Sequence, residues 1–340
     1  MKVSLVFDKY FNLFLLSKYR TQLMGVAALM IILCHAPQYG VDVHGILRKL
    51  LVFLNIGVDI FLFLSGMGCC FSLMKPHRYF PWLKKRFIRL LIPYTIILLM
   101  LRVIGFGIVN ISWSEWLLYF STLRFWTHHD GMWYIALLVL LYPLAPFFFK
   151  IFEHSKNRAL SAIILLVLIL LITHIQIKTP SDLTNSILIN LQWAFKRIVS
   201  FILGMYLAPY IKRGLRVNIF YIMGASAFGC VLFHFLMRDV FYSWLYVLPV
   251  LLLFCLFFDR LSEKSVSDIF FLWLGSASLE SYLTNIGIKA LMPLYLDKYL
   301  YLPLFAGHYL DYSFVIILGL CLTYITNKLS NKVISKTATT

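Results

Sequence analysis

Long apolar runs follow one another along almost the whole chain, and this feature constrains the fold more than any other. A helix of about 18 to 20 apolar residues can cross the ~30 Å hydrocarbon core of a bilayer. Hydrophobic residues make up 61% of the 340 residues and charged residues 13%, whereas a soluble domain is about half apolar and a quarter charged. A membrane β-barrel would show short alternating segments, and the run LLVLILL at 165–171 has no alternation. The sequence therefore predicts an all-α, polytopic integral membrane helical bundle.

The spacing of these runs predicts about ten transmembrane helices in one domain that covers residues 1–340. The predicted helices are 20–37, 50–74, 86–108, 131–150, 159–176, 187–209, 217–236, 241–258, 267–288 and 311–328. Residues 1–19 are expected to form an amphipathic lead-in at the membrane surface, and residues 330–340 a loose cytoplasmic tail. Trp113 and Trp116 within 109–124 favour an interfacial helix there, because Trp is enriched at membrane–water boundaries.

The positive charges lie in short clusters between the apolar runs. The formal net charge of +17 suggests a nucleic-acid ligand, but this distribution instead follows the positive-inside rule. Of the 31 Lys and Arg residues, 21 fall in the segments on one side, 7 on the other and 3 within predicted helices. We therefore predict no nucleic-acid partner, a location in the cytoplasmic (inner) membrane, and both termini in the cytoplasm.

The cysteines and histidines give no sign of a metal centre. All six cysteines lie within apolar runs, where cysteine usually serves as a small packing residue. No spacing of His, Cys and carboxylate residues matches a metal site. The sequence therefore predicts neither a bound metal nor a disulfide.

Ionisable side chains recur at similar depth inside five predicted helices. Counted from the basic residue at the inner end of each helix, all of them lie ~20–24 Å above the inner boundary. They are His35, Asp59, Arg102, Lys196, Arg197 and Glu280. Because ionisable groups are costly inside a bilayer, such a layer marks a functional site by default.

This polar layer is compatible with catalysis, with transport and with a purely structural role. A neutral His35 could take a proton from a hydroxyl nucleophile. Asp59 could orient that imidazole, and cations could stabilise an oxyanion or bind an anionic substrate. The same residues could instead form buried ion pairs or reach the interface with their polar ends. Transporters also place polar residues near the middle of the membrane.

Six segments, in this order along the chain, resemble the membrane acyltransferase-3 family of bacterial integral membrane proteins, which O-acylate surface and exported glycans. They are LMGVAALMIILCH at 23–35, NIGVDIFLFLSG at 55–66, KRFIRLLIPY at 85–94, WYI with LYP at 133–143, RIVSFILG at 197–204 and SLESYLTN at 278–285. The second segment is the most specific match. Met24 stands where the family commonly has Arg, with Arg20 one turn earlier, and Asn285 stands where a His is frequent.

The resemblance implies an O-acyltransferase, most simply an O-acetyltransferase, that moves an acyl group from acyl-CoA to a cell-envelope or exported carbohydrate. The implied donor is acetyl-CoA or another acyl-CoA on the cytoplasmic side, with no tightly bound cofactor. The implied acceptor is a glycan or lipid-linked saccharide. We expect His35 and Asp59 to be catalytic. Lys196, Arg197, Glu280, Trp133 and Arg102 are expected at the oxyanion or acceptor, and Arg86, Arg89, Lys85 and Arg20 at the acyl-CoA.

Two other functions remain open from the sequence. A polytopic transporter or flippase for a polar or anionic solute or glycan would use the same polar layer as its binding site. A non-catalytic accessory subunit of a polysaccharide export machine is the third alternative.

Overall fold

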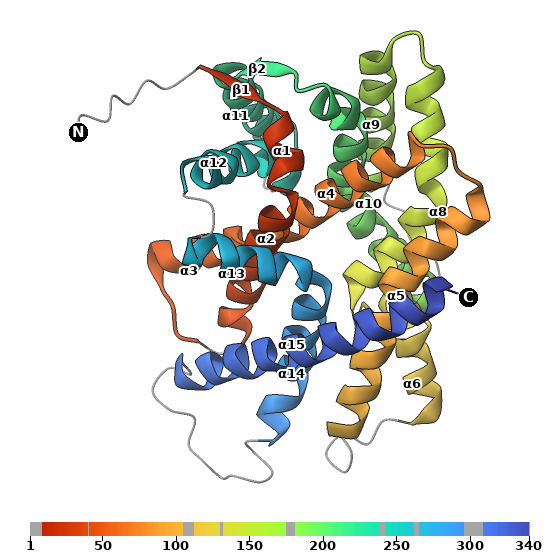
Figure 1. The fold of residues 1–340 in the computed structure, drawn as a ribbon, viewed down its shortest axis with the longest axis vertical. Coiled ribbons are helices and arrows are strands. Elements are labelled where there is room, and N and C mark those ends of the chain that lie inside the picture. Colours follow the sequence, from red (N-terminus) through yellow and green to blue (C-terminus); the bar gives the residue numbers. More distant parts are fainter. Residues whose placement is uncertain are drawn as a thin grey trace.

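The computed structural model describes residues 9–39, 41–104, 112–129, 132–174, 181–237, 242–261, 265–295 and 309–339. Two three-residue strands and a series of helices make up these ranges (Figure 1). The first half contains β1 (Tyr10–Asn12), α1 (Phe14–Lys18), α2 (Arg20–Cys34), η1 (Ala36–Tyr39), α3 (Gly45–Phe53), α4 (Ile56–Leu73), α5 (Tyr79–Ile104), α6 (Trp113–Phe120), α7 (Leu123–His128) and α8 (Trp133–His154). The second half contains α9 (Arg158–His174), α10 (Asp182–Lys212), β2 (Arg216–Asn218), α11 (Ile219–Met237), η2 (Ser243–Tyr246), α12 (Val247–Arg260), α13 (Val266–Ser276), α14 (Ser278–Tyr295) and α15 (Tyr309–Thr339).

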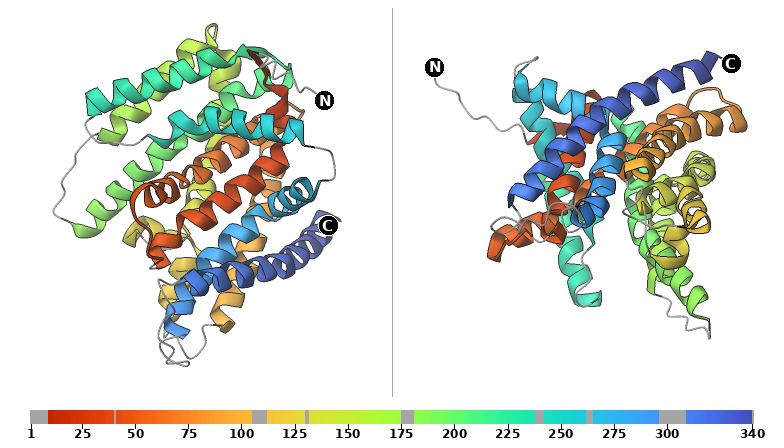
Figure 2. Two further views of the ribbon diagram at one scale, coloured as in Figure 1. Left: turned by 90° about the vertical axis from the view of Figure 1, so that its left-hand side faces the viewer. Right: turned by 90° about the horizontal axis from the view of Figure 1, so that it is seen from below.

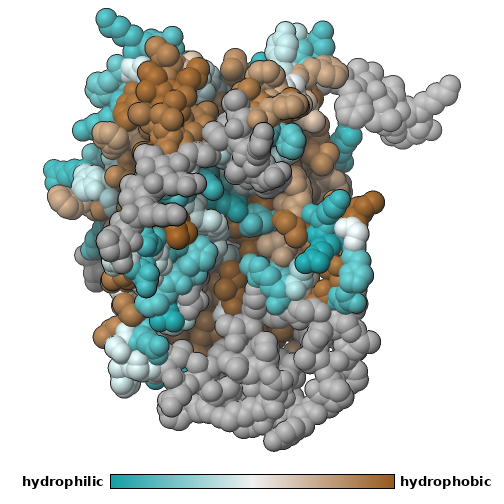
Figure 3. All heavy atoms as spheres, turned by 180° about the vertical axis from the view of Figure 1, so that it is seen from behind, coloured by the Kyte–Doolittle hydropathy of each residue, from teal (hydrophilic) through white to brown (hydrophobic). Residues whose placement is uncertain are grey.

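The all-α membrane class is confirmed. Within the described ranges, six helices are long and apolar enough to cross a membrane, and three shorter apolar helices accompany them. The count of ten remains a prediction. Large apolar side chains point outward, as expected where lipid is the solvent, and those of Phe220, Phe228 and Phe235 on α11 are examples. On the face shown in Figure 3, areas of exposed hydrophobic residues lie beside areas of hydrophilic ones.

Helix α4 forms the centre of the bundle and packs most extensively against α10. A helix that is apolar on all sides is expected to be buried, and most of α4 is buried. Gly66 and Gly204 allow the two backbones to touch. A Cβ on Gly66 would lie 2.0 Å from the Phe201 carbonyl oxygen, and one on Gly204 would lie 2.0 Å from that of Phe63. Small residues at such crossings are typical of membrane helix pairs.

Helix α2 lies on the other side of α4 and packs against α13, so α13, α2, α4 and α10 are successive neighbours (Figures 1 and 2). The helix predicted over 267–288 is in fact two helices, which meet at Ala277. The reason is a close crossing in which a Cβ on Gly275 would lie 1.8 Å from the Thr21 carbonyl oxygen. This contact holds α13 against the first turns of α2, while α14 packs on α15 and α5 as well as on α2.

The ends of the chain differ from their predicted forms. Strand β1 pairs antiparallel with β2, with Tyr10 opposite Asn218, and Leu16 of α1 is fully buried. The described part of the lead-in is therefore packed onto the fold. Helix α15 continues to Thr339, so the predicted loose tail is helical through that residue. No Gly or Pro follows Gly319 to interrupt this helix.

The segment predicted to hold an interfacial helix contains the short helix α6, and a second short helix, α7, begins at its end. Ser112 caps α6 through a capping box with Glu115, a common signal for a helix start. The Trp113 side chain is exposed, as an interface anchor would be. Residues 105–111 of the predicted segments lie outside the described residues.

Cysteine labelling tests the predicted topology. In a background without the six native cysteines, we expect Lys156→Cys, between α8 and α9, to resist a membrane-impermeant thiol reagent added to intact cells. His44→Cys, which precedes α3, should be labelled and serves as the matched control. The expectation follows from the excess of Lys and Arg on the predicted inner side. Labelling of Cys at position 156 in intact cells would contradict this orientation.

Candidate functional site

Two pockets lie at different levels of α4. The first, here called the arginine pocket, has a volume of about 180 Å³, and its lining includes Arg20, Arg86 and Arg89. The second, here called the Trp193 pocket, has a volume of about 620 Å³ and is lined by residues of α3, α10 and η2. Asn55 lines the Trp193 pocket and Phe61 lines the arginine pocket. At the rise of an α-helix, these two residues lie roughly 9 Å apart along the helix axis.

Arg86 of α5 is held in the wall of the arginine pocket by α4. Its Nη2 donates to the Gly68 carbonyl oxygen at 3.0 Å and to Ser72 Oγ at 2.5 Å. Trp82 Nε1 donates to the same hydroxyl oxygen at 2.8 Å, and the guanidinium carbon lies 5.6 Å from the centre of the Trp82 ring. These contacts fix the direction of a flexible side chain, which lowers the entropy lost on binding a ligand.

Arg20 of α2 lines the same pocket. Its Nε and Nη2 donate to the Leu64 carbonyl oxygen at 3.4 and 3.3 Å. A Cβ on Gly68 would lie 2.9 Å from Arg20 Nη2, so the glycine leaves room for the guanidinium. Met24 lines this pocket as well, which places Arg20 beside the position where the family commonly has Arg.

The three arginines give the pocket a strong positive charge. Among the described residues, none of Arg20, Arg86 and Arg89 forms an ion pair with a carboxylate. Ser65, Tyr134 and Tyr282 add hydroxyl groups to the wall. Such a site suits an anion, and guanidinium groups match phosphate oxygens especially well.

Asp59 lies between the two pockets and is fully buried. Its carboxylate forms an ion pair with Arg197 and accepts hydrogen bonds from Ser200 Oγ at 2.8 Å and Ser243 Oγ at 2.6 Å. Arg197 Nη1 also donates to Ser243 Oγ at 3.1 Å. This network joins α4, α10 and η2. A carboxylate with these partners has the character of a structural ion pair rather than of a group that orients His35.

Two tryptophans cover the Arg197 guanidinium. Its central carbon lies 5.8 Å from the ring centre of Trp133 and 5.5 Å from that of Trp193. The two rings meet edge to face with their centres 4.2 Å apart. Trp133 was expected at the acceptor. Trp193 was not predicted as a site residue. It lies one helical turn before Arg197, and this i, i+4 spacing could have indicated that the two side chains share a face.

His129 and Asn190 support this aromatic wall, and neither was among the expected site residues. His129 contacts Trp193 edge to face at 5.7 Å, and its Nδ1 bonds the side-chain oxygen of Asn190. Asn190 is fully buried, and its Nδ2 donates to the carbonyl oxygens of Phe125 and Trp126 at 2.9 Å each. The histidine pair at 128–129 was a visible signal, whereas a single Asn in an apolar helix gave none.

His35 is half-buried and directly follows the last residue of α2. Its Nδ1 lies 2.9 Å from Gln38 Oε1, and it is not among the residues that line either pocket. Gly57 lies opposite Ala27 and Ile31 of the antiparallel α2. His35 therefore lies roughly 10 Å beyond the level of Asp59, and the two residues do not share the predicted depth.

Glu280 also departs from the predicted layer. It follows Ser278 and Leu279, which line the arginine pocket, and its buried carboxyl group lies beside Asn327 and Ser330 of α15. The break at Ala277 explains this place, because the chain has not crossed the bundle when it reaches Glu280. Arg102 lies near the end of α5 with its guanidinium 5.6 Å from the Trp113 ring centre. Lys85 is exposed on α5.

Comparison with known proteins identifies the family. The model of the acyltransferase-3 family, described as an acyltransferase domain, matches residues 22–328, which is most of the chain. The chain belongs to the acyltransferase-3 family. The resemblance seen in six short segments is thereby confirmed, and the protein is a membrane acyltransferase. No curated protein and no solved structure gives a significant match.

Proposed function

We propose that this acyltransferase moves an acyl group, most simply acetyl, from acyl-CoA to a hydroxyl group of a cell-envelope or exported glycan. The observation that carries this proposal is the arginine pocket, in which three arginines have no acidic partner among the described residues. Coenzyme A carries several phosphate groups, and guanidinium forks bind phosphate in a bidentate manner. The pocket would therefore bind phosphate groups of the donor.

The Trp193 pocket is our proposed acceptor site. It offers aromatic rings together with Asn55, Ser243 and basic side chains, a combination typical of sites for polar small molecules. In the proposed orientation the arginine pocket faces the cytoplasm, where acyl-CoA is made, and the Trp193 pocket faces outward. Donor and acceptor would thus approach from opposite sides of the inner membrane, with both chain termini in the cytoplasm.

His35 is our proposed general base. The acceptor hydroxyl oxygen would attack the thioester carbonyl carbon while the imidazole takes the hydroxyl proton. Collapse of the tetrahedral intermediate would break the carbon–sulfur bond and release coenzyme A, whose thiolate sulfur takes up the proton that the imidazole had accepted. For this step the acceptor hydroxyl and the acyl carbon must both reach His35. Asp59 would hold Arg197 and the wall between the pockets in place.

A transporter is the second candidate, and one observation favours it. Two pockets at different levels of α4 are separated by a buried ion pair between Asp59 and Arg197. An alternating-access transporter also encloses its site between two gates. Acyl-CoA-dependent labelling of a glycan by purified protein would support the transferase. Solute flux that depends on an ion gradient, without such labelling, would support the transporter.

Replacement of both Arg86 and Arg89 by Ala should raise the KM for acyl-CoA at least ~10-fold. A hydrogen bond to a charged group contributes ~1.5–3 kcal/mol, and ~1.4 kcal/mol corresponds to a factor of ten. Replacement by Lys should be only partly tolerated, because Lys lacks the planar fork. Steady-state kinetics of purified protein measure the effect.

The matched control for this pair is Lys75→Ala with Arg78→Ala. These two cations are exposed between α4 and α5 and do not line the arginine pocket. The control removes the same charge and should leave the KM for acyl-CoA unchanged. An unchanged KM in the Arg86 and Arg89 variant, or an equal rise in the control, would count against this donor site.

A further inference from the structure

The side chains that line the Trp193 pocket give it a positive charge. Four basic residues line it, and no Asp or Glu is among the described residues of its lining. Arg197 is paired with Asp59, but within the described part of the chain Arg48, Lys49 and Lys196 form no ion pair. The pocket therefore carries an excess of three positive charges that the described protein does not neutralise.

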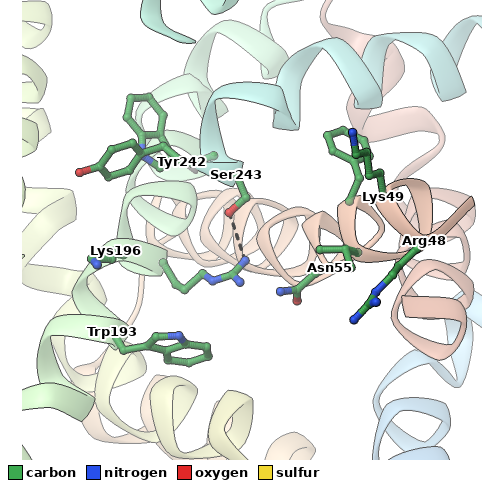
Figure 4. A pocket seen from close by; sticks show the side chains of 11 residues that line it. Arg48, Lys49, Asn55, Trp193, Lys196, Tyr242 and Ser243 are labelled. Atoms are coloured by element: carbon green, nitrogen blue, oxygen red, sulfur yellow. Dashed lines mark hydrogen bonds between the residues drawn. The ribbon is translucent and has the colours of Figure 1, made fainter. Parts of the chain in front are cut away.

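Membrane topology does not account for Arg48 and Lys49. In the proposed orientation they lie on the outer side, where Lys and Arg are normally depleted. They belong to the small α3, whose Ile46, Leu47 and Leu50 are exposed apolar residues. Figure 4 shows both cations on one side of the pocket and Lys196 with Trp193 on the other, with Asn55 between them. Basic residues from two separate helices thus face a common space.

The rest of the lining suits a sugar ring. Phe53, Trp193, Tyr242 and Trp244 supply aromatic surface, and the edge-to-face contact with Trp133 fixes the Trp193 ring. The apolar face of a pyranose can pack on such a ring while its hydroxyl groups reach polar neighbours. The volume of about 620 Å³ lies within the range of roughly 300–1,000 Å³ seen for small-molecule sites.

We propose that the acceptor is an acidic saccharide, whose carboxylate or phosphate group is attracted by the positive charges of Arg48, Lys49 and Lys196. The proposal rests on the glycan-acylating function proposed above and specifies its substrate class. The anionic group would lie between α3 and α10, and the sugar ring would lie against Trp193. A neutral sugar would leave the three cations around the pocket without a counter-charge, which is unfavourable. Charge on the acceptor therefore determines specificity at this pocket.

Binding to purified protein in nanodiscs of neutral phosphatidylcholine tests this inference without any acyl donor. The probes are a glucuronate-containing disaccharide, its uncharged methyl ester and a hexose phosphate, each titrated calorimetrically. We expect the carboxylate or the phosphate form to bind ~10-fold or more tightly than the ester, since one charge-assisted hydrogen bond supplies a factor of that size. Of the carboxylate and phosphate probes, the one that binds more tightly identifies the anionic group that the pocket prefers. The preference should weaken as salt is added.

The triple variant with Arg48, Lys49 and Lys196 changed to Gln should lose the preference for the anionic probe. The control changes Lys75, Arg78 and Lys332 to Gln, which removes the same charge outside the pocket. This control variant should keep the preference for the anionic probe. Equal binding of acid and ester, binding of neither, or an undiminished preference in the triple variant would overturn the inference. So would loss of saccharide binding when phosphatidylglycerol is added to the discs, because the cations would then bind lipid headgroups.

The same titrations separate this inference from the proposed function. If acyl transfer to a neutral glycan is found while acid and ester bind equally, the acyl-transfer function stands and the acidic acceptor is excluded. If the acid is preferred but no glycan is acylated from acyl-CoA, the proposed function fails although the pocket binds acidic sugars.

Discussion

Replacement of His35 by Ala is expected to reduce acyl transfer by at least ~10²-fold, while expression and membrane insertion remain normal. A sugar hydroxyl has too high a pKa to attack a thioester unaided, and general-base catalysis typically contributes ~10²–10⁴ in rate. The imidazole is suited to this task because the unperturbed pKa of His lies near neutrality. Initial rates of transfer by purified protein at saturating donor and acceptor measure the loss.

Two further variants make the test of His35 specific. His35→Gln retains a group that can hydrogen-bond to Gln38 but cannot accept and release a proton, so it should be nearly as inactive as His35→Ala. His44→Ala removes an exposed imidazole whose partner is the exposed Asp42, and it should leave transfer unchanged. If His35→Ala retains more than about a tenth of the wild-type rate, a loss well below the range for a general base, His35 is not the base.

Removal of the Asp59 carboxylate is expected to destabilise the helix bundle strongly. Asp59→Ala leaves the Arg197 guanidinium, whose side chain is 12% exposed, without its counter-charge. Breaking a buried ion pair from one side typically costs ~3–5 kcal/mol. Ser200 and Ser243 would lose their acceptor at the same time. Reversible unfolding in detergent, followed by circular dichroism, measures the change.

A double-mutant cycle tests whether loss of the Asp59–Arg197 ion pair causes this destabilisation. Asp59→Asn combined with Arg197→Gln removes both charges, so it should be more stable than either single variant, with a coupling energy of ~0.5–3 kcal/mol. Asp42→Asn, at a side chain that is 66% exposed, should change stability by no more than ~0.5 kcal/mol. If the two single effects simply add, the ion pair does not hold α4 to α10.

The segment at 55–66 shows how much of the fold could be predicted from the sequence. Its apolar character and its small residues predict a buried helix in close contact with another, and α4 is such a helix. The α-helical membrane class follows from the same local physics, because every backbone polar group in hydrocarbon must be satisfied within the segment. Helix ends were harder to predict, as the continuation of α15 to Thr339 shows.

The depths of the polar residues were predicted less well. Counting from the nearest basic residue assumes that each helix crosses the bundle directly. The contact between Gly25 and Gly275 prevents this for α13, and Glu280 consequently lies near the arginine pocket. A contact between two glycines far apart in sequence is set by tertiary packing, so neither helix alone reveals it.

Pairing within the layer also depended on the tertiary fold. Asp59 and Arg197 were both expected near the site, yet only the parallel packing of α4 and α10 makes Arg197, rather than His35, the partner of Asp59. Arg48 and Lys49 were counted only as loop charges on the outer side. Their place at the Trp193 pocket depends on the tertiary packing that brings α3 beside residues of α10 and η2.

Mass analysis of envelope glycans tests the central claim most directly. Glycans from cells that carry the gene should contain an alkali-labile acyl ester, most simply acetyl, which glycans from cells without the gene lack. Cells that express His35→Ala should match the cells without the gene, although the protein is present in the membrane. Identical glycan masses in all three strains would contradict the proposal that this acyltransferase modifies an envelope glycan.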